Sequence, residues 1–110
     1  MENTEKSATE ARKYIYNKAT EFAQAKANRI YIEQFLKSKR ALLMNESTAT
    51  TMTAKEADAY AHQDYINLLY GLKEAVALEE ELRWKMVSAQ ATIEIYRTES
   101  ANNRAIDKGM

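Results

Sequence analysis

The amino-acid sequence predicts an all-α protein: a long antiparallel helical hairpin, coiled-coil-like, with a short middle helix. The 110-residue chain contains no proline and two glycines, Gly71 and Gly109, so it lacks the residues that β-turns use most. Apolar residues recur every seven positions in two long segments, which is the repeat of packed helices. This length fits one helical domain, residues 1–110.

Capping patterns set the expected helix boundaries. Ser7 is followed by Glu10, a capping box that predicts a helix start at Ser7. Thr53 and Glu56 form a second capping box, and Asp64 is the expected cap of the last helix. The expected segments are a helix over residues 7–44, a linker over 45–53, a short helix over 54–61 and a helix over 64–104.

The two long segments each carry a seam of apolar residues in the a and d positions of a heptad repeat. In the first segment the seam is Ala8, Ala11, Ile15, Lys18, Phe22, Ala25, Arg29, Ile32, Leu36, Lys39 and Leu43. In the last segment it is Tyr65, Leu68, Leu72, Ala75, Glu79, Leu82, Met86, Ala89, Ile93 and Tyr96. Two such seams predict that the helices pack face to face.

Arg29 and Glu79 interrupt the seams with opposite charges. If the chain folds back through the linker, residues whose numbers add to about 108 face each other. Arg29 and Glu79 satisfy this condition. We expect them to form an ion pair that fixes the register of the helices, because an unpaired charge in the seam would be strongly destabilising.

A second set of residues, rich in apolar side chains, lies outside the seams. A two-helix hairpin buries one face of each helix, so a second apolar face requires a further partner. We therefore expect a homodimer, forming a four-helix bundle, because a monomer would leave a large apolar patch in water. The expected dimer contacts are Tyr16, Ala23, Ile30, Tyr70, Ala77, Trp84, Val87 and Ala91.

The formal charge is balanced overall but not along the chain. Residues 1–44 carry nine Lys and Arg against five Asp and Glu, a net charge of +4, and residues 45–110 carry −4. One interpretation is that the two oppositely charged halves attract each other when the chain folds. The alternative is weak nucleic-acid binding by the basic first helix. Its candidate residues are Arg12, Lys13, Lys37, Lys39 and Arg40.

The residue types needed for most active sites do not occur together. The single histidine, His62, has Asp58 four residues before it, but one histidine and one carboxylate do not complete a metal site. The chain has no cysteine, no paired Glu-x-x-His motif and no glycine-rich phosphate loop. We therefore expect no metal, no cofactor and no enzymatic activity.

One enzymatic alternative concerns the arginines. Small all-helical chorismate mutases hold a dianion with basic residues on long helices, and Arg12, Arg29 and Arg40 have spacings that resemble theirs. The linker offers no further arginine, and the acidic residue expected near Met52 and Thr53 is missing. We prefer the seam interpretation of Arg29.

The first residues are polar, and no apolar run approaches the length of a membrane span. This pattern predicts a protein without a secretory signal, located in the cytoplasm of the cell that makes it.

Two longer runs carry a resemblance. These are "YIYNKATEFAQAKANRIYIEQFLKSKRALLM" from residue 14 and "YINLLYGLKEAVALEEELRWKMVSAQATIEIYRTESANNRA" from residue 65. Together they resemble a group of small helical proteins of tailed bacteriophages, encoded among early genes for DNA recombination and replication. The resemblance implies a non-enzymatic accessory or adaptor protein acting with that machinery through protein contacts in a host cell. The alternative is an inhibitor that docks a host defence or repair factor.

Overall fold

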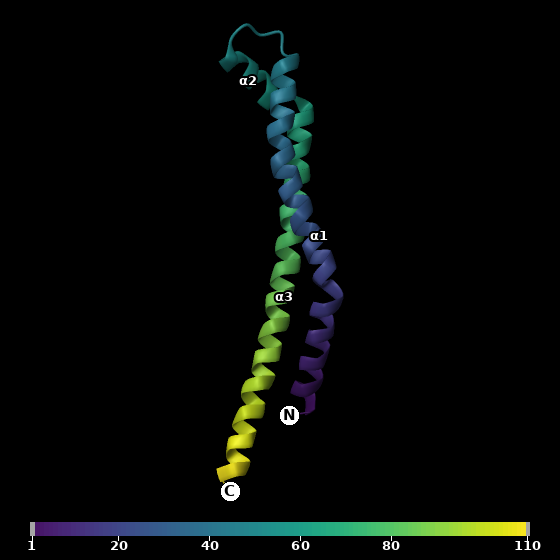
Figure 1. Cartoon of the computed structure of the whole chain (residues 1–110), viewed down its shortest axis with the longest axis vertical. Coiled ribbons are helices and arrows are strands. Elements are labelled where there is room, and N and C mark those ends of the chain that lie inside the picture. Colours follow the sequence, from purple (N-terminus) through teal and green to yellow (C-terminus); the bar gives the residue numbers. More distant parts are fainter. Residues whose placement is uncertain (1, 110) are drawn as a thin grey trace. The chain divides into compact units, whose positions relative to one another are not determined.

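The computed structural model consists of three helices, α1 (Glu2–Glu46), α2 (Met52–Ala61) and α3 (Gln63–Gly109), shown in Figure 1. It describes residues 2–109. The two long helices pack antiparallel and α2 stands between them in the chain, so the expected all-α helical hairpin is confirmed. Both long helices extend beyond their expected limits, because nothing in the flanking residues breaks a helix before Gly109.

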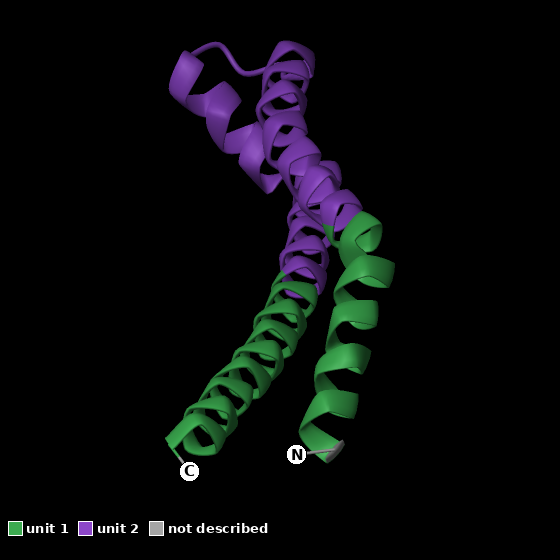
Figure 2. Cartoon of the chain, turned by 60° about the horizontal axis from the view of Figure 1, so that its bottom comes forward, with its two compact units in different colours: residues 1–22, 80–110 green, residues 23–79 purple. Residues whose placement is uncertain are grey.

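The helices form two compact units, coloured in Figure 2. Unit 1 contains residues 2–22 of α1 and residues 80–109 of α3, and unit 2 contains residues 23–79, which include α2. Within each unit a segment of α1 packs against a segment of α3.

The start of α1 differs from the expectation. The helix begins at Glu2, so Ser7 lies inside it as an exposed residue and is not its cap. The Thr9 hydroxyl donates to the carbonyl oxygen of Glu5 at 3.1 Å, a bond between successive helical turns that spans Ser7. Acidic residues near the helix N-terminus interact favourably with the helix dipole, which explains why the helix extends upstream.

The linker also uses a different cap. Thr51, not Thr53, is the N-cap of α2, and its hydroxyl accepts a hydrogen bond from the Ala54 amide at 3.1 Å. The linker starts with Ser47, whose hydroxyl accepts from the Ala49 amide and donates to the Asp58 carboxylate. This contact ties the linker to α2.

His62 separates α2 from α3 and takes the capping role expected of Asp64. Its backbone is extended (φ −68°, ψ 137°), and its carbonyl oxygen accepts from the Ile66 amide at 3.1 Å. Its ring atom Nδ1 accepts from the Asp64 amide at 3.0 Å. The single histidine is therefore a helix-cap residue, and Asp64 lies in the first turn of α3.

Burial follows the seams closely. Every seam position named above is buried or half-buried. Among the residues that the structure describes, Ala59 of α2 is the one buried residue outside the seams, and it is fully enclosed. The core of each unit is therefore a single layer between the two long helices, supplemented in unit 2 by α2.

We expect Leu82→Ala to lower the free energy of unfolding by about 2 to 5 kcal/mol, because Leu82 is 5% exposed and its loss leaves a cavity in the seam. Leu69, which is 44% exposed on the same helix, provides the control. Urea unfolding followed by circular dichroism measures both variants. Equal losses for Leu82→Ala and Leu69→Ala would contradict this assignment of the core.

Candidate interaction site

A charged layer interrupts the seam of unit 2, as expected from the register. The Arg29 guanidinium contacts the Glu79 carboxylate through two hydrogen bonds, from Nε to Oε2 at 2.5 Å and from Nη2 to Oε1 at 3.1 Å. The Glu79 side chain is 11% exposed and that of Arg29 is 24% exposed. The predicted ion pair between Arg29 and Glu79 is therefore present and has the bidentate geometry that binds carboxylates most specifically.

Glu33 also belongs to this layer. Arg29 Nη1 donates to both carboxylate oxygens of Glu33, at 3.2 and 3.1 Å. Hydrogen bonds to Glu79 and then to Glu33 raise the pKa of Arg29 above its usual range. Glu33 was not among the residues predicted for this layer, although its position one helical turn after Arg29 is a recognisable signal for an ion pair.

Two further ion pairs join residues of the basic first half of the chain to the acidic second half. Lys39 Nζ lies 3.4 Å from Asp64 Oδ2, and Arg40 Nη1 donates to Glu56 Oε1 at 3.0 Å. Arg40 Nη1 also donates to the Tyr60 hydroxyl oxygen at 3.1 Å. These two pairs and the Arg29–Glu79 pair all lie in unit 2, so part of the charge asymmetry serves to hold this unit together.

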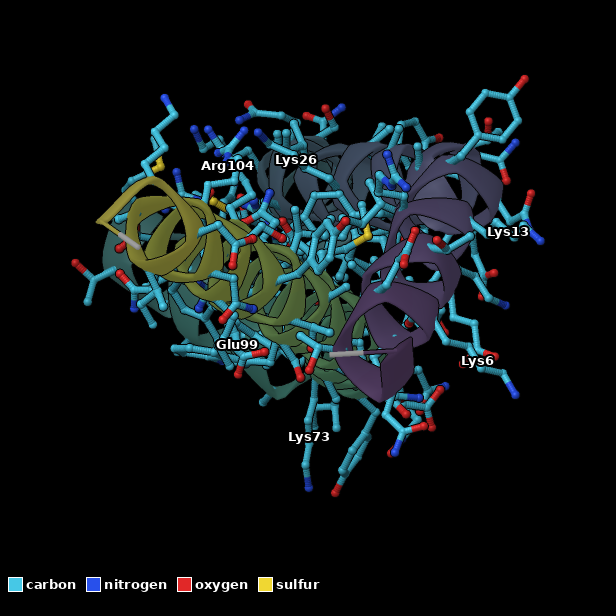
Figure 3. All side chains as sticks on the ribbon, turned by 90° about the horizontal axis from the view of Figure 1, so that it is seen from below. Lys6, Lys13, Lys26, Lys73, Glu99 and Arg104 are labelled. Atoms are coloured by element: carbon cyan, nitrogen blue, oxygen red, sulfur yellow. The ribbon has the colours of Figure 1, made fainter. Side chains whose placement is uncertain are left out.

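These contacts divide the five basic residues proposed for nucleic-acid binding. Lys39 and Arg40 contact carboxylates, whereas Arg12, Lys13 and Lys37 are exposed and take part in no ion pair with another described residue. The side chain of Lys13 points away from the helices in Figure 3. Arg29 and Arg40, two of the arginines in the mutase-like alternative, are likewise occupied by carboxylates.

The outer stripe is the set of apolar residues expected at the dimer contact. All eight of its members are exposed. Tyr16 is 85% exposed, Tyr70 63% and Trp84 59%. Large apolar side chains this exposed on both long helices indicate contacts with a partner or with further copies of the chain.

Trp84, a member of this stripe, contacts two charged neighbours on its own helix. Its ring atom Nε1 donates to Glu80 Oε2 at 3.1 Å, and the Arg83 guanidinium carbon lies 4.6 Å from the ring centroid. Arg83 also donates to the Glu80 carboxylate, at 2.6 and 3.2 Å. The ring is therefore exposed but held in one orientation by Glu80 and Arg83. Neither contact was predicted from the sequence, although Glu80 lies one helical turn before Trp84, at the spacing of interacting side chains.

No group of three or more His, Cys, Asp or Glu side chains gathers as metal ligands among residues 2–109. Asp58, the nearest potential partner of His62 in sequence, accepts a hydrogen bond from Ser47. His62 and Asp58 line a cavity of about 410 Å³ at the linker, together with Leu43, Glu46, Ser47, Thr48 and Ala61.

Comparisons of the chain with protein-family models, with curated proteins and with solved structures gave no match. Within the described part of the chain, none of the helices is both long enough and apolar enough to cross a membrane.

The burial of the Arg29–Glu79 pair in the seam predicts how replacing these residues changes the melting temperature. We expect Glu79→Ala to lower the melting temperature more than the double replacement Arg29→Leu with Glu79→Leu, because the single variant leaves Arg29 in the seam without its bidentate partner. Two leucines fill the same layer with apolar side chains. Thermal unfolding by circular dichroism compares the two proteins. A double variant less stable than the single one would contradict this role of the pair.

The ion pairs of the basic residues predict how strongly the protein binds nucleic acids. Because Lys39 and Arg40 are paired with carboxylates, we expect oligonucleotides to contact at most Arg12, Lys13 and Lys37. Fluorescence anisotropy of labelled single- and double-stranded oligonucleotides should then show weak binding, with a slope of log K against log salt no steeper than about −3. With the double-stranded oligonucleotide, a slope of about −4.5, the value for five phosphate contacts, would show that the pairs open to bind phosphate.

Proposed function

We propose that this protein is a non-enzymatic adaptor that acts by binding another protein through the outer-stripe residues of α3 in unit 1, with Trp84 as the anchor. The observation that carries this proposal is the exposed ring of Trp84 in contact with Glu80 and Arg83. Tryptophan and arginine are the residue types most enriched at the energetic centres of protein interfaces. A side chain already held in one orientation loses less conformational entropy when a partner covers it.

The residues around Trp84 fit a partner protein that presents a helix or a flat surface. Val87 and Ala91 follow Trp84 at intervals of three and seven residues, so they continue the same face of α3. Val87 is 41% exposed and Ala91 is also exposed. The charged groups of Glu80 and Arg83 border the ring and provide hydrogen-bonding groups at the rim of such a contact.

The identity of the partner is proposed from the resemblance to phage proteins. On that basis the partner belongs to phage DNA recombination or replication machinery. Self-association into a homodimer is a second part of the proposal, since the apolar residues of the outer stripe occur on both long helices.

Affinity capture with matched variants tests the adaptor function. Immobilised wild-type protein and Ile106→Ala should retain the same partner from lysate of infected cells, whereas Trp84→Ala should retain at least about tenfold less. Ile106 is 60% exposed, close to the 59% of Trp84, so it controls for the loss of an exposed apolar side chain. Circular dichroism verifies that both variants keep their helices.

Equal capture by Trp84→Ala and wild type would contradict Trp84 as the anchor. Capture of one host enzyme whose activity is then blocked would replace the adaptor function with the inhibitor alternative.

A further inference from the structure

We propose that the break between α2 and α3 is a pH-sensitive switch, with the imidazole of His62 as its control element. With neutral His62 the chain forms two helices here, and with protonated His62 it forms one helix from Met52 to Gly109. We call these arrangements the two-helix form and the continuous form. The break lies in unit 2 and Trp84 lies in unit 1, so the switch does not depend on the proposed adaptor contact.

The sequence around the break contains no residue that ends a helix by itself. Residues 52–70 include neither proline nor glycine. α2 is rich in alanine, the strongest helix former, and His62 is the one residue that separates α2 from α3. The break therefore depends on contacts of particular side chains and not on the helix propensity of the chain.

His62 supplies a hydrogen-bond acceptor that the two-helix form uses. In the continuous form the amides of Gln63, Asp64 and Tyr65 would donate to the carbonyl oxygens four residues earlier. In the two-helix form the Ala59 carbonyl oxygen accepts from the His62 amide at 3.2 Å instead. The Asp64 amide donates to His62 Nδ1 at 3.0 Å. An imidazole nitrogen accepts such a bond only when it carries no proton.

Protonation of His62 removes this acceptor. Both ring nitrogens of an imidazolium are donors, so Nδ1 would face the Asp64 amide as a second donor and the capping bond would be lost. The continuous form does not need that bond, because the Tyr60 carbonyl oxygen accepts from the Asp64 amide there. Histidine is the side chain whose charge changes between about pH 5 and about pH 8. Acid therefore disfavours the two-helix form relative to the continuous form.

Carboxylates from all three helices face His62. Asp64 Oδ2 of α3 lies 3.9 Å from Nδ1 and also pairs with Lys39 of α1 at 3.4 Å. Glu46 of α1 and Asp58 of α2 line the same cavity as His62. In the continuous form Asp58 would stand one helical turn before His62, at the spacing of a helical ion pair. Carboxylates thus stabilise the imidazolium in both forms, and the capping bond makes the difference between them.

The contacts that hold α2 in place are few and mostly polar. Ala59 is the α2 residue that is buried. α2 also takes part in three hydrogen bonds and one ring contact: Arg40 with Glu56, Arg40 with Tyr60, Ser47 with Asp58, and the ring of Tyr60 with that of Tyr65. Exposed polar contacts of this kind contribute little free energy each. The loss of one capping bond is therefore a substantial part of the balance.

The linker is long enough for the continuous form. His62 lies beside Glu46 in the register of the seam, and both line one cavity. A continuous helix would place Met52 about 15 Å beyond His62. With the two helix axes about 9 Å apart, Met52 would lie about 17 Å from Glu46. Six Cα–Cα steps connect these two residues, and they reach about 20 Å when extended.

The switch changes which charges are available at the linker end of unit 2. Continuing the heptad pattern of α3 places Asp58 and Ala61 on the seam side, so Glu56 and Tyr60 would lie on the outer side of the helix. Both would then leave Arg40, which they contact through one nitrogen, Nη1, in the two-helix form. Acid would thereby expose a guanidinium that the two-helix form keeps paired.

Nuclear magnetic resonance tests the switch, because the ¹³Cα chemical shift of residue 62 reports whether its backbone is extended or helical. At about pH 8 the wild-type shift should be that of an extended residue, and at about pH 5 it should move to the helical side. Protection of the Gln63 amide against hydrogen exchange should rise at least about tenfold at the lower pH, because this amide gains the Ala59 acceptor.

Replacements of His62 separate the capping bond from other effects of pH. His62→Asn keeps a side-chain acceptor that does not titrate, so residue 62 should stay extended at both pH values. His62→Ala has no acceptor and a higher helix propensity, so residue 62 should be helical at both. Glu46→Gln removes a neighbouring carboxylate of the cavity and is the matched control: it should keep the transition of the wild type.

Four results would overturn the switch. They are an extended residue 62 at the lower pH in the wild type, a break that persists in His62→Ala, a transition retained in His62→Asn, and loss of helical shifts throughout α2 at the lower pH. Capture of a partner through Trp84 is measured separately, so none of these results bears on the adaptor function.

Discussion

Two helices can shield only one face of each other from water, and this constraint governs the rest of the molecule. The seam takes up one face of α1 and of α3, and the remaining apolar residues stay exposed, including Tyr16, Tyr70 and Trp84. A third element, α2, adds cover only within unit 2, where Ala59 is fully enclosed. The surface left over is therefore where binding function is expected.

The seam itself was predictable because the heptad repeat depends only on the spacing of residues along one helix. The Arg29–Glu79 pair was predictable for a related reason: once an antiparallel turn is placed near the linker, the register follows by counting. The caps were not predictable in the same way. Several Ser and Thr residues compete in the linker, and Ser47 fixes its path through Asp58, a contact that depends on where α2 packs.

The candidate site was predicted in outline but not in detail. The exposed positions of the outer stripe could be read from helical periodicity, yet that periodicity does not show how firmly a side chain is held. Glu80 and Arg83 turn Trp84 from a surface residue into an oriented ring. The role of Lys39 depended on a tertiary contact with Asp64, because a lysine in a basic cluster gives no sign of its partner.

The ion pairs of the two units differ in a way that bears on what holds each unit together. In unit 2 the pairs of Arg29 with Glu79, Lys39 with Asp64 and Arg40 with Glu56 connect different helices. Among the described residues of unit 1, four pairs join residues three or four apart on one helix: Lys18–Glu21, Arg83–Glu80, Lys85–Glu81 and Arg97–Glu94. Pairs of this second kind survive when helices separate. In unit 1 the two helical segments are therefore held together mainly by the apolar side chains of the seam, such as Leu82, which is 5% exposed.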